Sequence, residues 1–162
     1  MIEYDLISKF YGSRTAKRSG VPLINHINEG LIILDHIGST DVVKGAYCIH
    51  PLFQSDENLI ENKGMDLTGV STESIILTME YRRVANSYLR FSSISSFVGI
   101  SLQEIKEMLI ADKIQNYKDF YKKSHFNSLE FGQLYNYFHV WFGILGIPED
   151  FANLVQLIDN DL

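Results

Sequence analysis

Hydrophobic residues recur every three or four positions along most of this chain, which is the spacing of amphipathic α-helices. Ile27, Leu31, Leu34 and Ile37 fall on one such face, and Gly38 follows them as a helix stop. No stretch shows the convincing period-two alternation of a β-strand, and the sequence has no internal repeat. The pattern therefore predicts an all-α protein of six or seven helices.

Boundary signals divide the chain into these helices. Ser101 and Glu104 form a capping-box pair at the start of the clearest one. Residues 51–70 are rich in Asn, Asp, Gly and Ser, and they predict one long loop. Each of the three prolines stands at an expected boundary: Pro22, Pro51 and Pro148. The predicted helices cover residues 25–37, 41–50, 72–89, 102–122 and 127–146, followed by a last helix that Pro148 opens.

Composition adds limits on location and partners. The 162 residues are 46% hydrophobic and 21% charged, which suits one globular domain over residues 1–162. A net charge of −6 argues against binding to nucleic acid, but it permits a small anionic ligand held by local Arg and Lys. The N-terminus is unlike a signal peptide, and apolar runs are far shorter than the roughly 20 residues that span a bilayer. We expect a cytoplasmic protein with no membrane partner, and a buried Cys48, the only cysteine.

Three polar residues interrupt apolar helix faces. Asp112 follows Leu109 at helical spacing, His50 follows Ala46, and His26 stands in the first turn of its helix. A buried carboxylate is unfavourable unless a metal, a cation or several donors meet it. One histidine on an apolar face is more often a hydrogen-bonded core residue than a ligand. One buried Asp is about as often a helix cap or salt-bridge partner as a functional acid. Together, two His and one Asp suit manganese, iron or zinc.

Four segments of the chain carry a family resemblance. They are GSRTAKRSGVPLINHINEGLIIL (12–34), IGSTDVVKGAYCIHP (37–51), MLIADKIQNYKDF (108–120) and LYNYFHVWFGILG (134–146). In this order and rough spacing they resemble the hydrolase domain of RelA/SpoT-type guanosine polyphosphate enzymes and their small single-domain relatives. The resemblance implies an HD-type helical bundle with a histidine/aspartate metal site and a nucleotide pocket.

The resemblance also implies a role for each matching residue. His26, His50 and Asp112 would hold the divalent metal, and Asn116 would contact the sugar of the nucleotide. The basic segment that grips the guanine and phosphate end would be covered by three residues: Arg14, Lys17 and Arg18. These assignments make a small nucleotide the expected ligand.

Departures from the family pattern weaken the case for catalysis. The His-Asp pair of the family is His50-Pro51 here, so one metal ligand is missing. The Glu-Asp pair that positions the attacking water is replaced by Gln54 and Ser55, with Asp56 next in the chain. Neither Gln nor Ser acts as a base near neutral pH. Gln54 and Asp56 are therefore the remaining candidates for orienting water, and slow or abolished hydrolysis is expected.

For other charged and aromatic residues, a binding role and an ordinary structural role are both compatible with the sequence. Arg82 is a candidate phosphate clamp, because its guanidinium fork matches phosphate oxygens, but it also suits a solvated helix face. Lys113 reads as a surface lysine beside Asp112. An aromatic stripe could stack a base or form an oligomer interface, but its spacing favours core packing: Tyr137, Phe138, Trp141 and Phe142. Tyr135 falls off this stripe, which favours exposure.

Two functions from different classes remain at this point. The first is a metal-dependent phosphohydrolase that acts on a guanosine polyphosphate-like nucleotide. The second is a catalytically inactive HD-like protein that binds a nucleotide or a protein partner through the old pocket or the aromatic surface. The missing acids favour the second function, whereas the retained His, Asp and Asn residues favour a pocket that is still in use.

Overall fold

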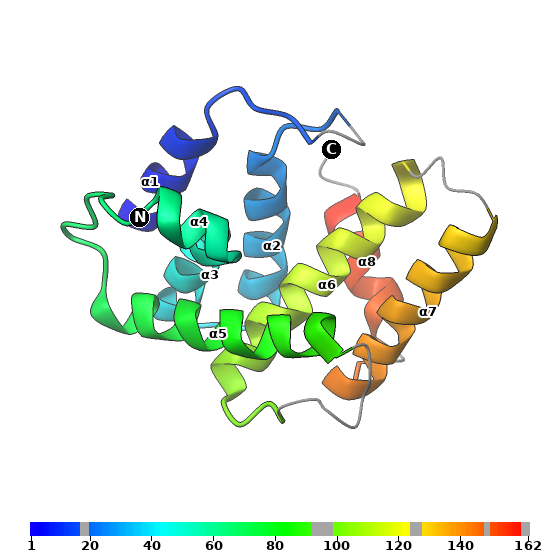
Figure 1. Ribbon diagram of the computed structural model, residues 1–162. Helices are drawn as coiled ribbons and strands as arrows, with labels where there is room; N and C mark the ends of the chain where they lie inside the picture. Colours follow the sequence, from blue (N-terminus) through cyan, green and yellow to red (C-terminus); the bar gives the residue numbers. More distant parts are fainter. Residues whose placement is uncertain (17–19, 92–98, 124–127, 148–149, 160–162) are drawn as a thin grey trace. The chain divides into compact units, whose positions relative to one another are not determined.

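The computed structural model describes residues 1–16, 20–91, 99–123, 128–147 and 150–159. Within these ranges the chain forms eight helices (Figure 1): α1 Ile2–Tyr11, α2 Ile24–His36, α3 Asp41–Phe53, α4 Asp56–Glu61, α5 Thr72–Phe91, α6 Gln103–Lys123, α7 Ser128–Leu145 and α8 Phe151–Asp159. The all-α prediction is confirmed, and the number of helices exceeds the six or seven expected. None of the helices in the described ranges has both the length and the apolar character needed to cross a membrane.

Two of the eight helices were not predicted. Helix α1 lies in a mixed N-terminal segment, and α4 lies within residues 51–70, which were wrongly expected to form one loop. Ser55 caps α4 by accepting the backbone N–H of Asn58, and the Asn58 side chain accepts the N–H of Ser55. This reciprocal capping box carries Asn where Glu or Gln is usual, so the sequence signal was weak.

Helix α3 continues past Pro51 to Phe53, so the predicted end at His50 is wrong. Proline has no N–H to donate to the carbonyl four residues earlier, which here belongs to Tyr47. That carbonyl accepts a hydrogen bond from Nδ1 of His50 at 2.6 Å. The imidazole thus takes the place of the missing backbone donor, and the last turn of the helix is retained.

The remaining boundaries agree closely with the pattern. Helix α2 ends at His36, and Gly38 follows with φ 76°, the left-handed conformation that ends many helices. Helices α5 and α6 end two and one residues beyond the expected positions. The predicted boundaries at Asn127 and Pro148 lie outside the described residues.

The chain divides into two compact units, and each contains two stretches of sequence. Unit 1 consists of Met1–Gly12 and Gly38–Leu109, and unit 2 consists of Ser13–Ile37 and Ile110–Leu162. The first part of α6 belongs to unit 1 and the rest to unit 2. The single domain expected over residues 1–162 stays a prediction.

Unit 1 is built around α3, which packs against α1, α4 and α5. Two of the buried hydroxyls of unit 1 donate to backbone carbonyls of α3. Thr78 donates to the carbonyl of Ala46 at 3.0 Å, and Ser74 donates to that of Val42 at 3.1 Å. Cys48 is fully buried, as predicted, and burial, with a smaller contribution from Glu3, raises the pKa of its thiol to about 12.

Unit 2 contains an aromatic core on α6, α7 and α8, and its α2 packs against α8. Phe138, Trp141 and Phe142 are buried, which confirms that this part of the aromatic stripe packs in the core. The ring of Phe142 stacks on that of Phe151 with centroids 4.8 Å apart. Tyr135 is 42% exposed, as its position off the stripe predicted.

Candidate functional site

Two of the predicted metal ligands meet within unit 2. His26 lies in the first turn of α2, and Asp112 lies in the middle of α6. Nε2 of His26 is 3.6 Å from Oδ1 of Asp112. The Asp112 side chain is 8% exposed and that of His26 is 19% exposed, so the pair lies at the edge of the buried interior.

The hydrogen bonds of Gln115 determine which nitrogen of His26 carries the proton. The amide nitrogen of Gln115 donates to carboxylates of Glu29 and Asp119, at 3.1 and 2.9 Å. Because carboxylates only accept, this places the amide oxygen towards His26, whose Nδ1 lies 2.6 Å away. Nδ1 must then donate, and in the neutral ring the lone pair is on Nε2, which faces Asp112.

A buried ion pair stabilises the position of the Gln115 amide. Nζ of Lys118 pairs with Oε1 of Glu29, and both side chains are almost fully buried. Glu29 also accepts the hydrogen bond from Gln115, so one carboxylate satisfies a buried cation and a buried amide together. Buried charges are tolerated when they are paired and hydrogen-bonded in this way.

Asp112 has donors on both of its oxygens. Oδ1 accepts from the side-chain amide of Asn116 at 2.8 Å, and Oδ2 accepts from Nζ of Lys113 at 2.7 Å. Lys113 is buried, so the expectation of a surface lysine is wrong; its ammonium lies 5.8 Å from the ring centre of Tyr137 and 5.1 Å from that of Trp141. Burial lowers the pKa of Lys113, but the neighbouring Asp112 and Tyr137 outweigh it and leave that pKa raised. The lysine is therefore a cation.

The His26–Asp112 pair suits a divalent metal in donor type and separation. An imidazole nitrogen and a carboxylate oxygen are ligands that zinc, manganese and iron accept. Donor atoms 3.6 Å apart are close enough together for one metal ion with bonds of about 2.1 Å to reach both. The competing cation is Lys113, which already neutralises Oδ2 of Asp112.

The third predicted ligand, His50, lies in unit 1 near the end of α3. It is 4% exposed, and its ring lies 4.9 Å from that of Tyr47 and 5.0 Å from that of Tyr81, measured between centroids. Since Nδ1 donates to the Tyr47 carbonyl, the lone pair of the neutral ring is again on Nε2. The three-ligand site of His26, His50 and Asp112 draws on both units and stays a prediction.

The predicted water-orienting residues form a polar cluster in unit 1. Nε2 of Gln54 donates to Oδ1 of Asn86 at 3.0 Å, and Asn86 donates back to the Gln54 carbonyl at 2.9 Å. Arg82, one turn before Asn86 on α5, pairs with the exposed carboxylate of Asp56. Oε1 of Gln54 and Nε of Arg82 are buried and have no hydrogen-bond partner among the described residues. Gln54 can therefore accept a hydrogen bond from a water molecule.

The basic segment is described only in part. Arg14 is exposed, and its carbonyl accepts the N–H of Leu23 at 2.9 Å, next to a β-bridge between Thr15 and Pro22. Lys17 and Arg18 lie outside the described residues. The predicted role of this segment in binding substrate stays a prediction.

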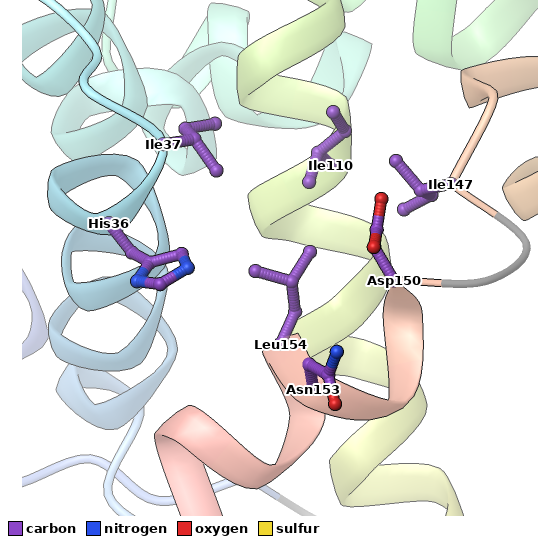
Figure 2. Close-up of a pocket in the computed structure, with 7 residues that line it drawn as sticks. All are labelled: His36, Ile37, Ile110, Ile147, Asp150, Asn153 and Leu154. Atoms are coloured by element: carbon purple, nitrogen blue, oxygen red, sulfur yellow. The ribbon is translucent and has the colours of Figure 1, made fainter.

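A hollow in unit 2 contains none of the predicted site residues. It has a volume of about 220 Å³ and lies between the end of α2, the middle of α6 and the start of α8. Figure 2 shows aliphatic side chains lining it, with the imidazole of His36 on one wall and the side chains of Asp150 and Asn153 on another. His36 has no role predicted from the sequence, and the residues that line the hollow do not indicate one.

Sequence reasoning missed three residues that organise the site: Glu29, Gln115 and Lys118. All three are at most 2% exposed. Asp112 was singled out because it is a polar residue at helical spacing from an apolar one. The same signal was present for two of these residues, since Gln115 lies four positions after Ala111 and Lys118 lies three positions after Gln115. What the sequence did not provide was the partner, because Glu29 lies 86 residues before Gln115 and 89 before Lys118.

In comparisons with known proteins, no family model, no curated protein and no solved structure matches this chain. The resemblance to RelA/SpoT-type hydrolase domains therefore rests on the four sequence segments alone.

Proposed function

We propose that this chain is an HD-type nucleotide-site protein in which His26, His50 and Asp112 hold a divalent metal. The nucleotide is a guanosine polyphosphate or a close analogue. One observation carries the proposal: Nε2 of His26 lies 3.6 Å from Oδ1 of Asp112, while Nδ1 is taken by the amide oxygen of Gln115.

Two acceptor atoms that face one another favour a positive charge between them. A neutral imidazole lone pair and a carboxylate oxygen repel at this distance, and both are partly withdrawn from water. A shared proton or a metal ion relieves the repulsion. The carbonyl of Tyr47 directs the lone pair of His50 to Nε2 in the same way, which supports metal binding over a proton because a metal accepts several such nitrogens.

The other residues have roles that follow from their chemistry. A divalent metal held by these residues would supply a water of lowered pKa and would polarise a phosphoryl oxygen. Oε1 of Gln54 accepts a hydrogen bond and orients water, Asn116 and the segment with Arg14, Lys17 and Arg18 bind the nucleotide, and Arg82 is a further phosphate contact. Asp56 pairs with Arg82, and the missing acids make the expected turnover slow.

One observation favours a second function, a non-catalytic binder of a nucleotide or a protein partner. Both oxygens of Asp112 already accept N–H groups, one from Asn116 and one from the buried ammonium of Lys113. A carboxylate satisfied in this way is stable without a metal. In this second function the His26–Asp112 pair shares a proton, and the pocket binds its ligand without hydrolysis.

Metal analysis of the purified protein, paired with phosphate release from a nucleotide panel with added manganese, separates the two functions. The proposal expects near-stoichiometric metal and slow turnover, both lost in His26→Ala and His50→Ala. His36→Ala is the matched control, because His36 is an exposed histidine of α2 outside the site. Metal-free protein whose melting temperature rises with a nucleotide supports the binder. No response to metal or nucleotide contradicts both nucleotide functions and leaves a protein partner.

A further inference from the structure

We infer that Gln115 is a positioning residue that selects the tautomer of His26 and thereby presents Nε2 to Asp112. The inference rests on the proposed function for its purpose, since a ligand needs an unprotonated Nε2. The tautomer of His26, however, is a property of the metal-free protein. It can be tested whether or not a metal binds.

The first step is the orientation of the Gln115 amide. Its NH₂ group lies between two carboxylates, those of Glu29 and Asp119. A flipped amide would place its oxygen against both acids and lose two hydrogen bonds. The environment therefore holds the amide oxygen against Nδ1 of His26, at 2.6 Å.

The second step is the anchoring of that environment. Glu29 is in α2, one turn after His26, and its carboxylate is paired with Lys118 in α6, close to Gln115. Lys118 also lies 3.4 Å from Asp119. Glu29 and Asp119 would otherwise repel each other, and the Lys118 ammonium keeps both carboxylates close to the Gln115 amide. The acceptor for His26 is consequently held in place by charges.

The third step is the consequence for His26. With a fixed acceptor at Nδ1, the proton of the neutral ring stays on Nδ1. Without that acceptor the proton moves to Nε2, because Oδ1 of Asp112 lies 3.6 Å away and accepts it. The ring would then offer Asp112 a proton and could no longer offer a metal its lone pair.

Two variants of Gln115 separate positioning from simple packing. Gln115→Met keeps the length of the side chain but removes the acceptor, whereas Gln115→Glu keeps an acceptor and removes the donor. Both lower stability, because both deprive Glu29 and Asp119 of a hydrogen bond. Only Gln115→Met is expected to move the proton from Nδ1 to Nε2. The ring ¹⁵N chemical shifts of His26, measured by NMR in chelator-treated protein at a pH where the ring is neutral, report this directly.

Zinc affinity, measured by competition with a chromogenic chelator, gives the second readout. We expect Gln115→Met to weaken zinc binding roughly 10- to 100-fold, the range found for partners that orient a ligating histidine. Gln115→Glu is expected to retain most of the affinity. Urea denaturation of each variant establishes that it is folded under the assay conditions.

The outcomes distinguish this inference from the proposed function. Nε2–H in the wild-type protein, or Nδ1–H retained in Gln115→Met, overturns the positioning role even if zinc binds. A switch in both variants also overturns it, because the acceptor would not be what selects the tautomer. A switch in Gln115→Met alone supports the role, and it does so even if the wild-type protein binds no zinc and the proposed function fails. If Gln115→Met does not fold, the wild-type spectrum still tests the role, because Nε2–H there overturns it and Nδ1–H supports it.

Discussion

The two units bury polar groups in different ways. In unit 1, several buried neutral side chains donate to backbone carbonyls. Thr78, Ser74 and His50 each donate to such a carbonyl on α3. In unit 2, several buried charged and amide side chains bind one another, as in the pair Glu29–Lys118.

The two histidines make this difference concrete. Each donates from Nδ1 at 2.6 Å, so in each neutral ring the lone pair is on Nε2. The acceptor of His50 lies three residues away in the same helix, whereas the acceptor of His26 is Gln115, 89 residues away. The same tautomer is thus reached through local geometry in one unit and through a long-range side-chain network in the other. A network of side chains can be broken at several points, but a helix carbonyl cannot be removed by substitution.

The largest expected effect comes from breaking the charged pair of unit 2. Glu29→Leu leaves the buried Lys118 ammonium without its main partner, which costs about 3–5 kcal/mol of the free energy of unfolding. Urea denaturation measures this loss. The double variant Glu29→Leu/Lys118→Met removes both charges and should recover most of it. A loss below about 1 kcal/mol in the single variant would mean that the pair behaves like a surface ion pair.

The burial of Cys48 in unit 1 predicts a pH dependence of the free energy of unfolding. Its pKa is raised from 9.0 to about 12 in the folded protein, mainly by burial, so the fold holds the thiol in its protonated form. Below pH 9 both folded and unfolded states are protonated, and this contribution to stability is complete. Between pH 9 and 12 only the unfolded state gains from ionisation, and stability falls by about 1.4 kcal/mol per pH unit.

Denaturation of the reduced protein at pH 8 and pH 10.5 tests this dependence. Cys48→Ala is the control, because other groups also titrate in this range and only the difference between the two proteins reports the thiol. The wild-type protein should lose about 2 kcal/mol more than the variant. Parallel losses in the two proteins would show that the thiol ionises as readily in the folded state as in the unfolded one.

Restoring an acid beside His50 sharpens the comparison at the metal site. Pro51→Asp supplies the carboxylate that follows this histidine in the family the sequence resembles, and an added ligand should raise zinc or manganese affinity about tenfold or more. Pro51→Asn is the matched control, because it also restores a backbone N–H but brings no charge. Calorimetric titration measures both. Equal affinities in the two variants would argue against position 51 facing a metal.

The smallest expected effect concerns the local control of His50. In Pro51→Ala, the new N–H of residue 51 competes with Nδ1 of His50 for the Tyr47 carbonyl. A hydrogen bond of this kind contributes about 1 kcal/mol. Losing part of it to the new N–H should lower the population of the Nδ1–H tautomer of His50. The ring ¹⁵N shifts of His50 report the change, with His50→Asn used to assign them. An unaltered tautomer would show that the proline is not needed to free the carbonyl.

Local sequence patterns determined most of the helical architecture. The stripe ending at Ile37 and the stop at Gly38 located α2, and apolar spacing located α5 and α6 to within two residues. The same spacing predicted the buried positions of Trp141 and Phe142. These features follow from contacts between residues three or four apart, which the period of hydrophobic residues records.

Tertiary structure decided what the polar residues do. Lys113 looked like a surface residue, and Glu29 carried no signal at all, yet both are buried beside charged partners. Helix α3 passed Pro51 because a side chain replaced the missing backbone donor. Hydrophobic burial is non-directional, so a one-dimensional pattern can predict it. A buried charge or hydrogen bond needs one particular partner in one orientation, and for His26 and Glu29 only the folded chain brings that partner within reach.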